Sequence, residues 1–134
     1  MFRFVLSILG ILLVTGIAAQ KKDQVLTLMF YNVENLFDTE SHPEKEDDEF
    51  TPGSEKAWDM EKYDKKLNDI ASVIRAVNKD ELPEIVGLCE VENIKVLEDL
   101  VQTRDLKRGH YGIVHHESPD TRGIDCALLY NMEE

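Results

Sequence analysis

Residues 84–93 constrain the fold of this chain more than any other segment. An apolar run, Ile-Val-Gly-Leu-Cys, follows Glu84 and leads directly into Glu90. Short apolar runs of this kind are typical of strands that are covered on both faces in α/β proteins. An ionised carboxylate at such a place costs several kcal/mol unless it is paired or bound to a cation. Glu90 is therefore paired with a base, a metal ligand, or the first residue of an exposed loop.

An earlier apolar run, residues 24–33, ends in a similar way. Its β-favouring residues predict a strand in the centre of a sheet, covered on both faces. Asn32 stands near its end, and Asn35 follows in a group of polar and aromatic residues. Such strand ends often form sites in layered α/β proteins. The Asn32 amide can orient a phosphate and a neighbouring ligand, or it can simply bond a local turn.

Two segments have the periodicity of amphipathic helices. For residues 59–78 we expect Asp59 as the N-cap, with Trp58 packing against Tyr63. For residues 93–103 we expect Asn93 as the N-cap. The side chains expected to face inward are Met60, Tyr63, Leu67, Ile70, Ile74 and Val77 in the first helix, and Ile94, Leu97, Leu100 and Val101 in the second.

The order of the predicted elements defines the fold class. Residues 84–91, 111–116 and 124–130 are β-like, and the last two runs flank a turn with Pro and Gly. Strand, helix, strand, helix, strand, strand predicts an α/β domain in which helices cover a mixed sheet. Residues 40–52 are predicted to be a loop. Its acidic run 44–49 lacks the glycine of an EF-hand and is predicted to be solvated.

The first 19 residues predict a secretory signal peptide, followed by one domain over residues 20–134. Arg3 precedes an apolar run at residues 4–14, and small residues follow at 16–18. A membrane anchor is the alternative, although the run is short against the roughly 20 residues that a bilayer requires. We expect cleavage, export to the periplasm or the extracellular space, and no stable membrane association afterwards.

Charge and cysteine content limit the partners. The formal net charge is −12, so the chain lacks the basic excess by which proteins hold a polyanion along an extended face. A local site with a metal ion is still compatible with this charge. Cys89 and Cys126 both fall in apolar runs. They can form a disulfide in an exported protein or pack as two buried thiols.

Polar residues around the last predicted strand have open roles. Arg122 can clamp a phosphate with two hydrogen bonds or be solvated. Asp125 is unusual in an apolar run and is expected to be paired, with Arg122 as the nearest candidate, although a place near the metal is also open. The histidines of this region are expected to be surface or packing residues rather than acid–base catalysts. They are His110, His115 and His116.

Three segments together resemble the amino-terminal half of the endonuclease/exonuclease/phosphatase superfamily, which has the deoxyribonuclease-I-like fold. They occur in family order at residues 30–38, 85–93 and 118–130. The resemblance implies a four-layer α/β sandwich and hydrolysis of a phosphodiester or phosphomonoester with Mg²⁺ or Mn²⁺. Nucleic acid is the substrate favoured by the family, with small phosphodiesters and lipid head groups left open.

The resemblance also assigns roles to single residues. Glu90 would bind the metal, and Asn32 would position the phosphate and contribute to the metal site. Arg122, in the Arg-Gly-Ile-Asp stretch that opens a strand lining the site, and Asn35 are the expected substrate-binding residues.

The motifs of the family's second half, Asp-x-Asn and Ser-Asp-His, do not occur in this sequence. We therefore expect one sheet of a two-sheet sandwich, with an uncovered apolar face and half of a catalytic site. One interpretation is the amino-terminal portion of an exported phosphoesterase, inactive by itself. The other is a non-catalytic half-domain that acts by association with another chain.

Overall fold

The computed structural model describes residues 25–78 and 81–133. The predicted signal peptide lies outside these residues. Within them, no helix is long and apolar enough to cross a membrane. The elements in chain order are β1 (Leu28–Leu36), the 3₁₀ helix η1 (Asp48–Phe50), α1 (Met60–Val77), β2 (Ile85–Val91), α2 (Ile94–Val101), the 3₁₀ helix η2 (Lys107–Gly109), β3 (Tyr111–His116) and β4 (Asp125–Asn131).

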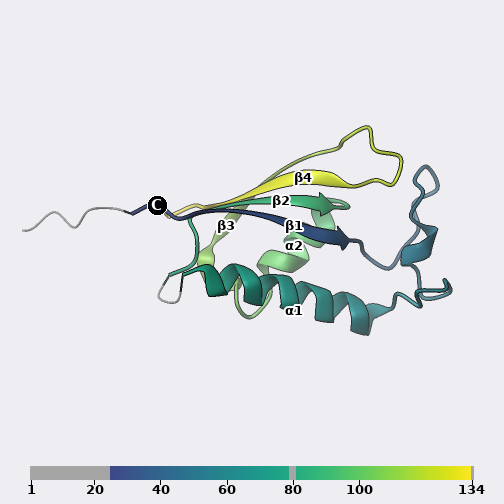
Figure 1. Cartoon of the computed structure of the whole chain (residues 1–134), viewed down its shortest axis with the longest axis horizontal. Helices are drawn as coiled ribbons and strands as arrows, with labels where there is room; N and C mark the ends of the chain where they lie inside the picture. Colours follow the sequence, from purple (N-terminus) through teal and green to yellow (C-terminus); the bar gives the residue numbers. More distant parts are fainter. Residues whose placement is uncertain (1–24, 79–80, 134) are drawn as a thin grey trace, which may run out of the picture.

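The four strands form one mixed sheet in the order β1-β2-β4-β3. β1 is parallel to β2, whereas β4 is antiparallel to both of its neighbours. Figure 1 shows that α1 and α2 lie on the same side of this sheet. The α/β class with helices covering a mixed sheet is confirmed.

The position predicted for the first strand is wrong in the described part of the chain. β1 lies at the edge of the sheet, and Leu28 and Phe30 on its outer face are 65% and 71% exposed. The prediction failed because an apolar residue on each face of a strand does not reveal whether a second layer covers the outer face.

One apolar core fills the space between the helices and the sheet. Val86 and Leu88 of β2 and Leu129 of β4 are fully buried, in the same cluster as Ile70 and Ile74 of α1. Burial of each such side chain contributes about 1.5–3 kcal/mol. These contacts hold the helices against one face and fix the strand ends that carry the polar residues.

The helix starts are as the sequence predicts. The Asp59 carboxylate accepts the backbone N–H of Lys62 at 3.0 Å, and the Asn93 side chain accepts that of Val96 at 3.0 Å. The ring of Trp58 packs edge-on against Phe50, with centroids 5.9 Å apart, and its expected contact with Tyr63 stays a prediction. These caps satisfy N–H groups that the first turn of a helix leaves free.

The inward faces are confirmed in the middle of each helix and wrong at three terminal positions. Met60, Val77 and Ile94 are 55%, 47% and 44% exposed. Each is the first or last residue of its helix, beyond the turns that pack on the sheet. The buried residues are Tyr63, Leu67, Ile70, Ala71 and Ile74 of α1 and Val96, Leu97, Leu100 and Val101 of α2.

The acidic loop after β1 is only partly solvated. Asp47 is 1% exposed, and its carboxylate accepts the Ser41 hydroxyl and the backbone N–H of His42, both at 3.0 Å. The predicted solvation of residues 44–49 is therefore wrong at Asp47. The reason is that a loop that donates several hydrogen bonds to one carboxylate replaces its water.

The sheet face opposite to the helices is apolar and uncovered in the described structure, as the sequence predicts. Its exposed side chains come from β1, β3 and β4. They are Leu28, Phe30, Val114, Leu128 and Tyr130.

Candidate functional site

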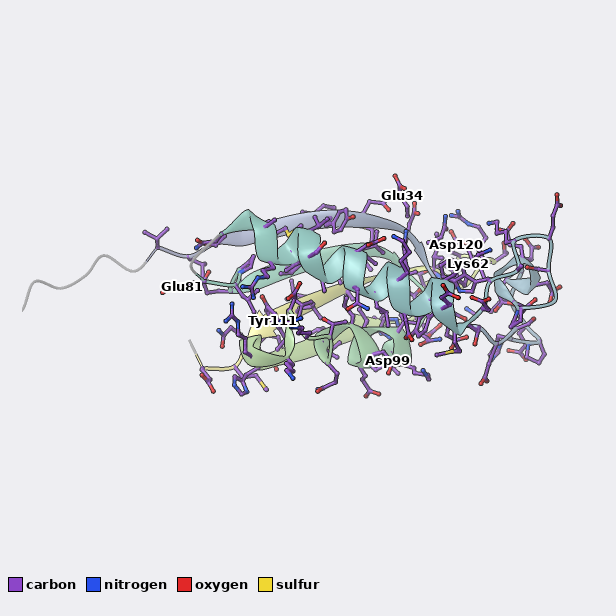
Figure 2. All side chains as sticks on the ribbon, turned by 90° about the horizontal axis from the view of Figure 1, so that it is seen from below. Glu34, Lys62, Glu81, Asp99, Tyr111 and Asp120 are labelled. Atoms are coloured by element: carbon purple, nitrogen blue, oxygen red, sulfur yellow. The ribbon has the colours of Figure 1, made fainter. Side chains whose placement is uncertain are left out.

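The predicted site residues lie toward one end of the sheet, with Asn32 and Asn35 in β1, Glu90 in β2, and Arg122 in the loop between β3 and β4. β1 and β2 point toward this end, and the loop between β3 and β4 reaches it as well (Figure 1). In Figure 2, Asp120 of that loop lies at this end, and Tyr111 at the start of β3 lies toward the other. The loop is tied to the acidic loop because the Glu46 N–H donates to the Thr121 carbonyl at 2.9 Å.

Asn32 and Glu90 meet at this end, as their places at two strand ends suggest. Asn32 Nδ2 donates to Glu90 Oε1 at 3.0 Å, and Asn32 Oδ1 accepts the backbone N–H of Glu34 at 2.8 Å. A backbone N–H can only donate, so the second bond sets the orientation of the amide. The amide nitrogen therefore faces the Glu90 carboxylate.

Irregular backbone in both strands makes this contact possible. Glu90 has a φ of +64°, and the register between β2 and β4 shifts between Cys89 and Val91. In regular alternation Glu90 would share the helix-covered face with Leu88. Instead Val91 is fully buried there, and Glu90 reaches Asn32, whose neighbours on the same face of β1 are exposed. Bulges commonly redirect side chains in this way.

β1 is irregular opposite the same place. Its register with β2 shifts between Asn32 and Leu36, and Glu34 and Asn35 have φ values of +55° and +65°. Asn35 is half-buried, and its side chain makes no hydrogen bond within the described part of the chain. Non-glycine residues with positive φ are uncommon and concentrate at functional sites.

Arg122 lies in the loop before β4 and is exposed. Its guanidinium binds the Asp120 carboxylate with two hydrogen bonds, Nε to Oδ1 at 3.1 Å and Nη2 to Oδ2 at 2.9 Å. The pKa of Arg122 is raised by these bonds with Asp120, and the charge of Glu90 adds to the shift.

The pairing expected between Asp125 and Arg122 is wrong. Asp125 Oδ2 lies 2.8 Å from His115 Nε2, and Asp125 Oδ1 accepts the backbone N–H of Ser118 at 2.7 Å. Both side chains are buried, with 0% of Asp125 and 8% of His115 exposed. The reason is the hairpin register: His115 lies opposite Ala127, which shares a strand face with Asp125.

Of the three histidines, His110 and His116 are exposed, as expected of surface residues. His115 instead packs in the interior and is paired. The sequence held one signal for this pair, because Asp125 is a carboxylate within an apolar run and such a group requires a partner when buried. Sequence reasoning missed it by looking for a partner nearby in the chain.

A group that could hold a metal ion lies around this pair. The ligand atoms of His115, Glu117 and Asp125 lie within 4.8 Å of one another. However, both oxygens of Asp125 already have protein partners, and Lys45 Nζ lies 3.5 Å from Glu117 Oε2. An ammonium beside Glu117 disfavours a second cation. We therefore regard the group mainly as the anchor of the loop between β3 and β4.

Glu92 is a buried carboxylate that sequence reasoning did not single out. It is 8% exposed and accepts the backbone N–H of Asp38 at 2.7 Å. Burial raises the pKa of Glu92 to about 7; the Asp38 N–H opposes this shift, and the charges of Asp38 and Asp47 add to it. Its contact joins the chain after β2 to the chain after β1, and so supports the end of the sheet that carries Glu90.

The fold and this strand-end geometry define an α/β domain that places a carboxylate and an amide in contact toward the end of two parallel strands. Open α/β sheets bind ligands at such strand ends. A model of the Endonuclease/Exonuclease/phosphatase family matches residues 27–134. The chain belongs to this family, which confirms the resemblance seen in the three motifs. Its class is therefore that of phosphoesterase- and nuclease-like proteins. Comparison with curated proteins and with solved structures gave no match.

Proposed function

We propose that this chain supplies the Glu90 half of the site of an exported, divalent-metal-dependent phosphoesterase that hydrolyses phosphodiesters, with nucleic acid as the favoured substrate. The observation that carries the proposal is the contact between Asn32 and Glu90 at two irregular strand ends, in a chain of this family. Export rests on the apolar run that follows Arg3.

The donor set fits Mg²⁺ or Mn²⁺. Glu90 offers carboxylate oxygens, of which only Oε1 receives the hydrogen bond from Asn32. Asn32 Oδ1 accepts one N–H and retains a second lone pair. Hard oxygen donors of this kind suit Mg²⁺ and Mn²⁺ better than Zn²⁺. Such an ion would supply Lewis-acid stabilisation of negative charge on the phosphoryl group.

The protein's own groups have separable roles in this proposal. Asn32 holds the Glu90 carboxylate through Nδ2 and so fixes the direction of the metal ligand. Arg122 is proposed to bind a phosphate oxygen through the N–H groups that Asp120 does not use, because Asp120 occupies only Nε and Nη2 of its guanidinium. Asn35 is proposed to donate to substrate, and its side-chain amide makes no hydrogen bond within the described residues that would compete.

A Mg²⁺ titration followed by thermal unfolding tests the assignment of Glu90. We expect the full chain to gain stability with Mg²⁺ and Glu90→Gln to lose most of this gain, since a bound ligand stabilises by mass action. Glu98→Gln, an exposed position on α2, is the matched control and should keep the gain. An unchanged gain in Glu90→Gln contradicts the assignment. Loss of the gain in His115→Ala alone would move the ion to the other cluster.

The uncovered apolar face favours a second candidate function, that of a non-catalytic half-domain that associates with another chain. The stability gain with Mg²⁺, measured together with turnover, separates the two candidates. Under both of them we expect this chain alone to show negligible hydrolysis of a generic phosphodiester with Mg²⁺. Hydrolysis that disappears in Glu90→Gln would instead show that these residues suffice, and a Mg²⁺ gain without turnover supports the proposed half-site.

A further inference from the structure

Two cysteines face each other on the uncovered side of the sheet, next to the candidate site. Cys89 of β2 and Cys126 of β4 are register partners in an antiparallel pair, and their Sγ atoms lie 3.7 Å apart. Cys126 is exposed and Cys89 is half-buried, so solvent reaches the pair. The sequence contains two cysteines, so each has the other as its one possible partner within the chain.

The backbone at this position suits a cross-link. Directly opposed residues of antiparallel strands have Cα atoms roughly 4.5–5.5 Å apart, within the roughly 4.4–6.8 Å that a disulfide spans. The strands need not move apart or slide, since the pair is already in register. Rotation of the two thiols toward each other is the main change required.

We propose that Cys89 and Cys126 are a modification site, which forms an intramolecular disulfide with glutathione disulfide or a similar small disulfide as the oxidant. The bond joins β2 to β4 at the last paired residue before the register shift. It therefore fixes the strand at the residue preceding Glu90. This inference depends on the thiol geometry and does not depend on the proposed phosphoesterase function.

The exchange is balanced in two steps. The Cys126 thiolate, which is the more accessible, attacks glutathione disulfide, forms a mixed disulfide and releases one glutathione. The Cys89 thiolate then attacks the Cys126 sulfur and releases the second glutathione. Two electrons pass from the protein pair to the oxidant, and the two thiol protons end on the two glutathione thiols.

Redox equilibration of the full chain tests the proposal. Reduced protein is equilibrated with series of reduced and oxidised glutathione, quenched with acid, labelled with maleimide and analysed by intact mass. We expect a product that takes up no maleimide and has no disulfide between chains. In this product the peptides of Cys89 and Cys126 are joined. Its midpoint of thermal unfolding should rise by on the order of 10 °C, because the cross-link closes a 37-residue separation.

The same equilibration in concentrated urea provides the comparison. A disulfide that stabilises the folded state must also form more readily in the folded state. The equilibrium constant for forming the disulfide should therefore be at least about tenfold larger in the folded chain than in the unfolded chain. Cys89→Ser and Cys126→Ser are controls that should stop at the mixed disulfide with no thermal gain. A folded chain that keeps both thiols, cross-links only between chains, or shows no preference over the unfolded chain would overturn the proposal.

Discussion

The left-handed backbone at Glu90 determines the face of the sheet on which its carboxylate lies. A left-handed conformation costs an L-residue roughly 1–2 kcal/mol, and such strain persists where the surroundings determine it. Here the surroundings are Val91, which is buried on the helix side, and Asn32, which binds the carboxylate on the other. The proposed metal ligand thus occupies a strained position, which is the arrangement expected where function competes with stability.

Replacing Glu90 by glycine and by alanine should separate the cost of backbone strain from the effect of losing the carboxylate. Both variants lose the carboxylate, but only glycine relieves the cost of a φ of +64°. We expect Glu90→Gly to be more stable than Glu90→Ala by about 1 kcal/mol in urea unfolding. The matched control is Glu98 in α2, where the order should reverse because glycine weakens a helix by about 1 kcal/mol relative to alanine. Equal stabilities at position 90 would contradict the left-handed conformation.

The raised pKa of Glu92 leads us to expect that the stability of the chain depends on pH. Its pKa is raised from 4.5 to about 7, mainly by burial, so the folded state favours the neutral acid. The stability that the neutral Glu92 contributes to the folded state is complete below about pH 4.5 and is lost as the pH rises to about 7. The loss in the free energy of unfolding is up to about 3 kcal/mol. Glu92→Gln stays neutral and can still accept the Asp38 N–H. In EDTA, its stability relative to the parent should therefore rise across this range. A difference that does not change with pH would contradict the shift.

Among the elements, the helices were the easiest to predict from the sequence. The range 59–78 and the observed helix Met60–Val77 agree because the helix period and the cap at Asp59 are both local signals. The first strand was predicted to end at Val33, yet β1 continues to Leu36. Pattern reasoning stops at polar residues, and it could not foresee that the strand continues through two residues with positive φ.

The candidate site shows the same division between local and long-range information. Glu90 and Asn32 were found because each follows an apolar run, which is a local pattern. The pair of His115 and Asp125 was missed because it depends on the register of a hairpin. The sequence around Glu90 does not predict a left-handed backbone. Asn35, by contrast, is of a residue type that is enriched in that conformation.

At the scale of the whole molecule, residues 25–78 and 81–133 form a sheet that helices cover on one face. The helices bury one face, while the other exposes several large apolar side chains, among them Phe30 at 71% and Val114 at 54%. Monomeric soluble proteins seldom expose large contiguous apolar patches. This face is therefore where the chain is expected to meet another apolar surface, and it includes the cysteine pair and adjoins Asn32.

Self-association of the isolated chain should report on this face. We expect sedimentation velocity to show concentration-dependent association, and Phe30→Lys to weaken it by at least about tenfold in dissociation constant, since burial of a phenylalanine contributes about 1.5–3 kcal/mol. Lysine is well tolerated on an edge strand, so urea unfolding should show a chain that is still folded. Val73→Lys is the control, because Val73 is 41% exposed on α1, away from this face. A parent chain that stays monomeric at all concentrations, or equal weakening by both variants, would show that the uncovered sheet face does not drive association.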